Sequence, residues 1–228
     1  MNLIHVRTAR SIWLFDMVDL NPRGKNITEK LVEWVRDKYH FSVAPDSKNL
    51  PVVINNKEGL VFEHGTFQVG EVSEEISIEV KFTIFNDGIV IDTRSSTADG
   101  NRFAEDLLKN AVQEFGLSFD ENTVRKRLYF SELIVRSELS LAGLNPISKD
   151  FSTHIEAVIP ENQRRQFRCA GLSFWSEPGD DGQHKRFVIE REVGRAFAEN
   201  RYFCQAPTST KAHLKLLETF EQMLQKGA

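Results

Sequence analysis

The ten residues ISIEVKFTIF, at positions 76–85, alternate apolar and polar side chains with unusual regularity. Successive side chains of a β-strand point to opposite faces of a sheet, so a period of two predicts a strand with one buried and one solvated face. The apolar face would carry Ile76, Ile78, Val80, Phe82 and Ile84, and the polar face Ser77, Glu79, Lys81 and Thr83.

A tight turn follows this strand at NDG, residues 86–88. Asp-Gly readily accepts the positive φ values of a type I′ hairpin, so we expect its two residues to form the loop and IVIDTR to form the return strand. That register pairs Thr83 with Asp92 and keeps apolar residues opposite apolar residues. It also places Asp92 diagonally across from Lys81.

Helical periodicity recurs in three further segments, each preceded by residues that favour a helix start. These segments predict helices at 28–39, 102–115 and 210–225. A second hairpin is predicted where QFRCAGLSFWSE and KRFVIEREV flank the turn-rich PGDDGQ. Other strand-like pieces are LIHV, IWLFDMVDL, PVVI and the long segment VRKRLYFSELIVRSEL, which fits a bent strand or a strand pair. The segment LAGLNPISKDFSTHIEAVIP is ambiguous.

Two segments of the chain resemble each other in plan. IVIDTRSST before the second predicted helix and RYFCQAPTST before the third both read as a strand, a Ser/Thr cap and an amphipathic helix, each after a hairpin. We therefore expect an α+β fold with mostly antiparallel sheet built from hairpins and about three helices on one face. The chain is interpreted as one domain, 1–228, that allows two packed halves, 1–120 and 121–228.

Composition excludes several classes of protein. The chain has 228 residues, 40% hydrophobic and 27% charged, enough for a core without disulfide support. A net charge of −4 without long runs of one sign disfavours a general nucleic-acid coat. Apolar runs such as GLVF fall far short of the roughly 20 residues that cross a membrane, and the first residues lack a signal-peptide pattern, which favours a cytoplasmic protein. Cys169 and Cys204 are expected to be buried thiols.

One candidate site is the polar face of the first hairpin. Hydrolysis of a phosphodiester needs carboxylates that converge on a divalent metal ion such as Mg²⁺, together with a lysine that orients water or neutralises charge. Glu79, Lys81 and Asp92 supply these residue types, and Pro45-Asp46 lies upstream. In residue type this set resembles the PD-(D/E)xK nuclease core, which implies a metal-dependent nuclease with these residues as catalytic groups.

The set also departs from that family. Its first acid and its Glu-x-Lys normally occupy adjacent strands, whereas Asp46 lies in a loop-like stretch with another strand pattern before Glu79, and Asp92 follows the motif. The simpler interpretation is a solvated hairpin face with opposite charges across the strands and no cofactor. The six scattered histidines lack metal-ligand spacing, and the sequence contains no serine-nucleophile, phosphate-loop or dinucleotide motif.

A second candidate site is an arginine cluster in the C-terminal half. Arg164, Arg165 and Arg168 are interleaved with Phe167 and lie near Trp175, a composition typical of surfaces that bind single-stranded nucleic acid. Glutamates on the same segments can neutralise these arginines as ion pairs. These are Glu132, Glu138, Glu190 and Glu192.

The interpretation favoured by the sequence is non-catalytic. The chain is rich in Phe, with 17, and carries aromatic residues close to loops, where aromatics and arginines commonly anchor protein interfaces. We expect an intracellular protein-interaction or assembly subunit of a bacterial or phage complex, with protein partners or itself as a homo-oligomer and no membrane partner. A metal-dependent nuclease and a single-stranded nucleic-acid binder are the alternatives.

Overall fold

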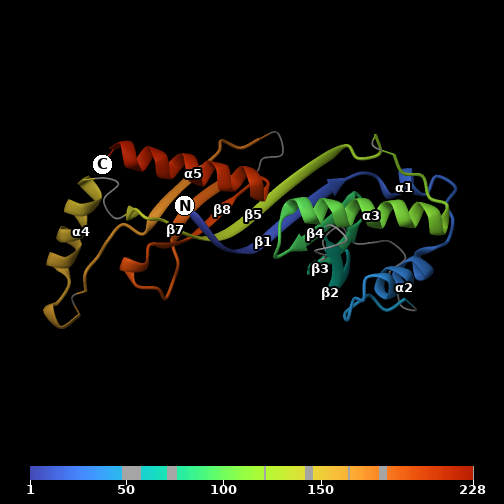
Figure 1. The fold of residues 1–228 in the computed structure, drawn as a ribbon, viewed down its shortest axis with the longest axis horizontal. Helices are drawn as coiled ribbons and strands as arrows, with labels where there is room; N and C mark the ends of the chain where they lie inside the picture. The colour runs from blue at the N-terminus through green and yellow to red at the C-terminus, as the bar shows by residue number, and fades with distance from the viewer. Residues whose placement is uncertain are drawn as a thin grey trace. The chain divides into compact units, whose positions relative to one another are not determined.

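The computed structural model describes residues 1–47, 58–70, 76–120, 122–141, 146–163, 165–179 and 184–227 (Figure 1). Its strands are β1 (Asn2–Leu14), β2 (Leu60–Val69), β3 (Ile76–Phe85), β4 (Gly88–Thr93), β5 (Lys126–Arg136), β6 (Gly171–Trp175), β7 (Arg186–Arg191) and β8 (Arg201–Ala206). Its α-helices are α1 (Met17–Leu20), α2 (Thr28–Lys38), α3 (Thr97–Phe115), α4 (Pro146–Val158) and α5 (Thr210–Gly227).

The fold is α+β, as the sequence predicts. Within the described residues eight strands form one sheet in the order β2-β3-β4-β1-β5-β8-β7-β6. The pairs β1–β4, β2–β3, β3–β4, β6–β7 and β7–β8 are all antiparallel. The hairpin prediction is confirmed for β3–β4 and for β6–β7.

The order of elements repeats along the chain. A strand, a helix, three strands and a long helix occur first as β1, α2, β2, β3, β4 and α3, and again as β5, α4, β6, β7, β8 and α5. Equivalent contacts also recur, because Ser11 Oγ on β1 donates to Thr97 O at 3.0 Å and Ser131 Oγ on β5 donates to Thr208 O at 3.1 Å. Apart from the short helix α1, the order of elements is therefore similar in the first and second parts of the chain.

The chain divides into two compact units whose boundaries cut across these halves. Unit 1 contains Met1–Arg7, Glu132–Pro207 and Lys211–Ala228, and unit 2 contains Thr8–Ser131 and Thr208–Thr210. Strands β1 and β5 each contribute residues to both units.

Unit 2 holds a core rich in aromatic rings. Phe103 of α3 is fully buried, with ring centroids 4.8 Å from Tyr39, 5.4 Å from Phe67 and 5.7 Å from Phe82. Helices α2 and α3 contribute the apolar faces that their periodicity predicts. Their buried residues are Val32, Val35, Phe103, Ala104, Leu107, Leu108 and Ala111.

The predicted register of the first hairpin is wrong, because the strands pair with a shift of two residues from the prediction. The loop is Asn86-Asp87, Gly88 begins β4, and Lys81 lies directly opposite Asp92 rather than diagonal to it. Both registers keep apolar residues opposite apolar ones, so the alternation could not separate them. Packing does, because a Cβ on Gly88 would lie 2.1 Å from Trp13 O, and only glycine permits β1 to approach this closely.

The N-terminal strand is longer than predicted. LIHV and the start of IWLFDMVDL belong to one strand, β1, and the end of the second piece forms the short helix α1. The polar residues between the two pieces are compatible with a strand. Arg10 lies on the polar face, and the Ser11 hydroxyl donates a hydrogen bond to the backbone of α3.

The three predicted helices are confirmed with small changes at their ends. Helix α3 begins at Thr97, five residues before the predicted start, because the Ser96 side chain accepts a hydrogen bond from Asp99 N and caps it. It ends at Gly116, whose φ of 60° is the left-handed conformation typical of a glycine that terminates a helix. Helices α2 and α5 cover the predicted ranges within two residues.

Unit 1 holds a smaller core between α5 and the strands β5, β7 and β8. Its fully buried side chains include Leu133, Ile189, Cys204, His213 and Leu217. VRKRLYFSELIVRSEL forms the single strand β5, and the ambiguous segment after it contains helix α4. The predicted buried thiol is present at Cys204, whose burial raises its pKa to about 12, whereas Cys169 is only partly buried.

The predicted strand PVVI lies at 51–54, outside the described residues. No helix of the described part of the chain is both long enough and apolar enough to cross a bilayer.

Candidate functional site

The hairpin site predicted from the sequence lies on the sheet face of unit 2 that points away from Phe103 and α3, here called the polar face. Lys81 stands opposite Asp92 on β4, and Asp92 stands opposite Arg10 on β1. One row of charged residues therefore crosses three neighbouring strands. The Arg10 and Lys81 side chains are 44% and 47% exposed.

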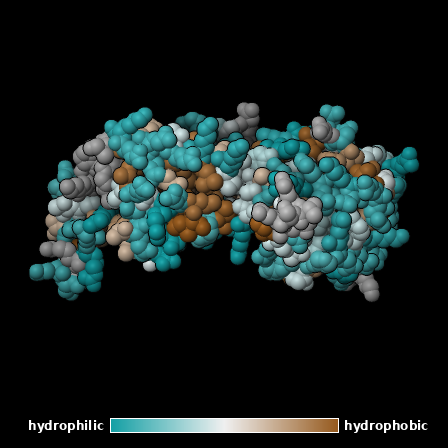
Figure 2. Space-filling view, viewed as in Figure 1, coloured by the Kyte–Doolittle hydropathy of each residue, from teal (hydrophilic) through white to brown (hydrophobic). Residues whose placement is uncertain are grey.

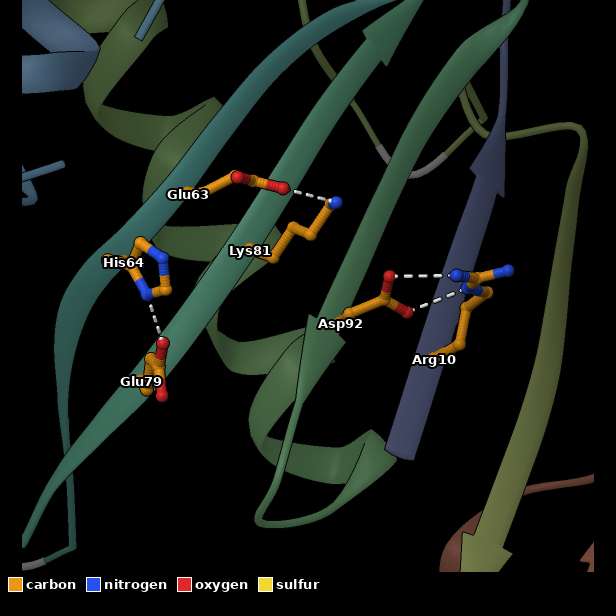
Figure 3. A network of polar contacts seen from close by, with 6 residues as sticks. All are labelled: Arg10, Glu63, His64, Glu79, Lys81 and Asp92. Carbon is orange, nitrogen blue, oxygen red and sulfur yellow. Dashed lines mark hydrogen bonds and ion pairs between the residues drawn. The ribbon is translucent and has the colours of Figure 1, made fainter. Parts of the chain in front are cut away.

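Every acid in this row has a cationic partner (Figure 3). Arg10 binds Asp92 through two hydrogen bonds, Nε to Oδ1 at 2.7 Å and a terminal nitrogen to Oδ2 at 2.9 Å. Lys81 Nζ donates to Glu63 Oε1 at 2.5 Å. The positive charge and hydrogen bond of Lys81 hold the pKa of Glu63 below its ordinary value.

A β-bulge in β2 completes the arrangement. The register shifts between Phe62 and Gly65, so that Glu63 and His64 together face Lys81 of β3. His64 has a φ of 57°, and its Nδ1 lies 2.6 Å from Glu79 Oε1. Gly65 is needed at the end of the bulge because a Cβ there would lie 2.4 Å from the Phe41 ring.

These contacts show which groups bind the predicted nuclease residues. Lys81 and Asp92 are brought together, but Glu79 binds His64, and Asp92 is held by Arg10. No group of three or more His, Cys, Asp or Glu side chains with metal-ligand geometry, and so none that includes Asp46, occurs among the described residues. The arrangement is a row of surface ion pairs, a kind of contact that contributes on the order of 0–1 kcal/mol per pair.

The predicted arginine site is only partly described. Arg164 lies outside the described residues, and Arg165 is exposed. The guanidinium carbon of Arg168 lies 5.1 Å from the Phe197 ring centre, and that of Arg191 lies 3.5 Å from the same centre. Glu192 Oε2 lies 2.6 Å from Arg201 Nε, an ion pair that involves none of the predicted arginines.

Unit 1 also carries an apolar surface that the sequence patterns singled out only in part, through Phe167 and Trp175. Among the described residues most of the exposed large apolar side chains belong to this unit. They are Leu3, Ile4, Phe151, Val158, Phe167, Phe174, Trp175, Val193, Leu216 and Met223, against Val18, Val43 and Ile76 in unit 2. Trp175 is 63% exposed and lies against Arg186, whose guanidinium carbon is 5.3 Å from its ring centre.

One part of this surface runs along α5 and the strands beside it. This part is named here the α5 surface. The Phe187 ring lies 5.6 Å from the buried His213 ring of α5 and 6.1 Å from the Phe174 ring on β6. Leu216 and Met223 continue the same side of α5 at helical spacing. Figure 2 shows apolar side chains gathered beside α5 over β7 and β8. The α5 surface comprises Leu172, Phe174, Phe187, Leu216, Phe220 and Met223.

An apolar cavity of about 190 Å³ lies inside unit 2 between α2, α3 and the sheet. Its lining includes Leu31, Val35, Phe82, Leu107 and Ala111, with Asn21 and Thr28 as its polar residues. The described residues that line the cavity include no charged group with which to position a polar substrate.

Comparison of the sequence with protein-family models and with curated proteins finds no match to either.

Proposed function

We propose that the protein is a non-catalytic, intracellular assembly subunit that binds a protein partner through unit 1. The observation that carries the proposal is the concentration of exposed apolar side chains in this unit, including Phe174 at 55%, Trp175 at 63% and Leu216 at 50%. Contiguous apolar surface on a folded protein typically marks an interaction site, because its exposure to water costs free energy that a partner recovers.

The chemistry of this surface supports a protein partner. Trp175 with Arg186 and Phe197 with Arg168 and Arg191 are aromatic and arginine pairs, the residue types that dominate the binding energy of protein interfaces.

The polar face of unit 2 supports the non-catalytic part of the proposal. A catalytic acid needs to be available to a metal ion or a substrate, whereas Glu63, Glu79 and Asp92 are each bound by a cationic or imidazole group of the chain itself. The row of ion pairs explains the Glu-x-Lys spacing as cross-strand pairing.

The test is purification of the tagged protein from its native host under mild conditions, followed by native mass spectrometry. A Phe174→Asp, Trp175→Asp variant should lose a species that co-purifies in fixed stoichiometry with the wild type. The matched control is Val18→Asp, Ile76→Asp, which places the same charges on exposed apolar residues of unit 2. Retention of the same species by the Phe174 and Trp175 variant, or a wild type that elutes alone and monomeric, would contradict the proposal.

A further inference from the structure

The internal repeat allows the two long helices to be compared residue by residue. Ser96-Thr97 begins α3 and Ser209-Thr210 begins α5. The two threonines exchange hydrogen bonds, Thr97 N to Thr210 Oγ1 and Thr210 N to Thr97 Oγ1, both at 3.1 Å. Thr97 and Thr210 are therefore equivalent, and counting from them pairs Phe103 with Leu216 and Leu107 with Phe220.

In the first half the α3 side that contains Phe103 is covered. Helix α2 lies beside α3 (Figure 1), with Val32 and Val35 only 2% and 1% exposed. Tyr39, the residue after α2, packs its ring edge against Phe103 at 4.8 Å and donates a hydrogen bond to Asp106 Oδ2 at 2.7 Å. Together with Phe41 and two rings of the sheet, Tyr39 buries Phe103 completely.

In the second half the equivalent side is uncovered. Leu216 is 50% exposed where its counterpart Phe103 is buried, and Phe220 is only partly buried where Leu107 is buried. Phe174 and Met223 extend the uncovered side across β6 and along α5. The α5 surface is thus the place on the second half that a helix occupies on the first.

Helix α4 holds the same position in the element order as α2 and is itself uncovered. Phe151, Ile155 and Val158 follow the i, i+4, i+7 spacing of one helix face, yet Phe151 is 64% and Val158 81% exposed. In Figure 1, α4 stands away from α5. With 13 residues against the 11 of α2, it is about 20 Å long against about 16 Å, so it can span the same site.

We propose that the α5 surface binds helix α4 of a second copy of this chain, and that two copies exchange α4 reciprocally to form a dimer. This inference rests on the proposed function, which requires only that the surface binds a protein. The same two faces, uncovered on each copy, meet twice in such a dimer, as a symmetric interface requires. Reciprocal exchange thereby doubles the area buried, which helps a short helix reach the roughly 1,200–2,000 Å² of a stable interface.

Contacts at both ends of α4 favour a second copy over the same chain. Before the helix, Leu141 is buried and its N donates to Tyr202 Oη at 3.0 Å, which leaves four residues before Pro146. At the other end, Glu156 Oε1 accepts a hydrogen bond from Phe167 N at 2.7 Å. Leu141 is thereby anchored to β8 shortly before α4, and α4 is joined to the residues that follow it, while its Phe151 and Val158 side chains stay exposed.

The test mixes two variants whose changes are at exposed positions and leave the core intact. The helix variant is Phe151→Asp, Val158→Asp, and the surface variant is Leu216→Asp, Met223→Asp. Purified wild type should be a dimer by light scattering and native mass spectrometry, and each variant alone should dimerise at least about 100-fold more weakly. An equimolar mixture should form the heterodimer, because it retains one intact pair of α4 and α5 surface. Val18→Asp, Ile76→Asp is the control and should dimerise as the wild type does.

Each other outcome overturns the inference. If the helix variant alone dimerises as well as the wild type, or the mixture does not restore a dimer, the copies do not exchange α4. If the wild type is monomeric up to about 100 µM, the second copy is not the occupant. The proposed function survives that result if the surface variant still loses a different protein that co-purifies from the native host, and it fails with the inference if nothing co-purifies with the wild type.

Discussion

Helices α3 and α5 occupy equivalent positions in the two halves of the chain, yet one is buried on the side where the other is exposed. Phe103 of α3 packs under Tyr39 and beside α2, whereas Leu216 of α5 is half exposed. Both helices carry the apolar spacing expected of a core helix. Helix α2 lies beside α3 in the first half, whereas the equivalent side of α5 is exposed, so the same element order gives a closed core in one half and an exposed apolar surface in the other.

The largest expected effect separates these two positions directly. Phe103→Ala removes a fully buried ring that contacts four other aromatic residues and should lower the free energy of unfolding by about 3–5 kcal/mol. Leu216→Ala should lower it by less than about 1 kcal/mol when measured on dilute protein. Urea unfolding followed by circular dichroism measures both. Equal losses would mean that Leu216 is covered in the isolated chain.

The buried histidine of α5 makes unit 1 sensitive to acid. Burial lowers the pKa of His213 to about 4 from the ordinary value of 6.5, so the unfolded chain binds a proton in the interval between them and the folded chain does not. The contribution of His213 to the free energy of unfolding is fully present above pH 6.5. The free energy of unfolding should fall by on the order of 2–3 kcal/mol as the pH drops to about 4. The equivalent residue of α3 is Gly100, which does not titrate.

Urea unfolding of wild type and His213→Gln at pH 7 and at pH 5 tests this dependence. The variant lacks the titrating group, so its loss of stability between the two values should be smaller than that of the wild type. The same loss in both proteins would assign the acid sensitivity to other groups.

The packing of unit 2 is imperfect at its apolar cavity. Ala111 of α3 lines the space of about 190 Å³, and Leu224 is its counterpart on α5. Ala111→Leu places apolar atoms in the void and should raise the free energy of unfolding by about 1 kcal/mol. Ala104→Leu is the matched control, since Ala104 is buried on the same helix but does not line the cavity, and overpacking there should cost about 1–3 kcal/mol. A loss of stability in both variants would mean that the cavity is filled in solution.

Local patterns predicted the elements of the fold well because each carries its own signal. The alternation of residues 76–85 predicted which residues of β3 face the core, and helical periodicity located α3 and α5, although α3 begins five residues before its predicted start. The hairpin register was wrong because two registers keep the same alternation, and the choice depends on the contact between Gly88 and Trp13, which are far apart in sequence.

The candidate sites were harder to predict for the same reason. Lys81 and Asp92 are correctly placed on one face, but only the folded structure shows that Arg10 and Glu63 bind them. The α5 surface left no signal in the sequence of α5, whose periodicity resembles that of α3. Comparing the two halves could have raised the question, but the exposure of Leu216 depends on the position of α4.

The smallest effects are expected on the polar face of unit 2. Asp92→Asn removes the charge that Arg10 binds at a half-exposed site and should lower the free energy of unfolding by at most about 1 kcal/mol. If the row of charges is only a set of ion pairs, wild type, Glu79→Ala and Lys81→Ala should all leave DNA and RNA intact with Mg²⁺ or Mn²⁺ present. Metal-dependent cleavage by the wild type that disappears in both variants would instead assign a nuclease site to this face, and the polar row of unit 2 would replace the apolar surface of unit 1 as the functional region.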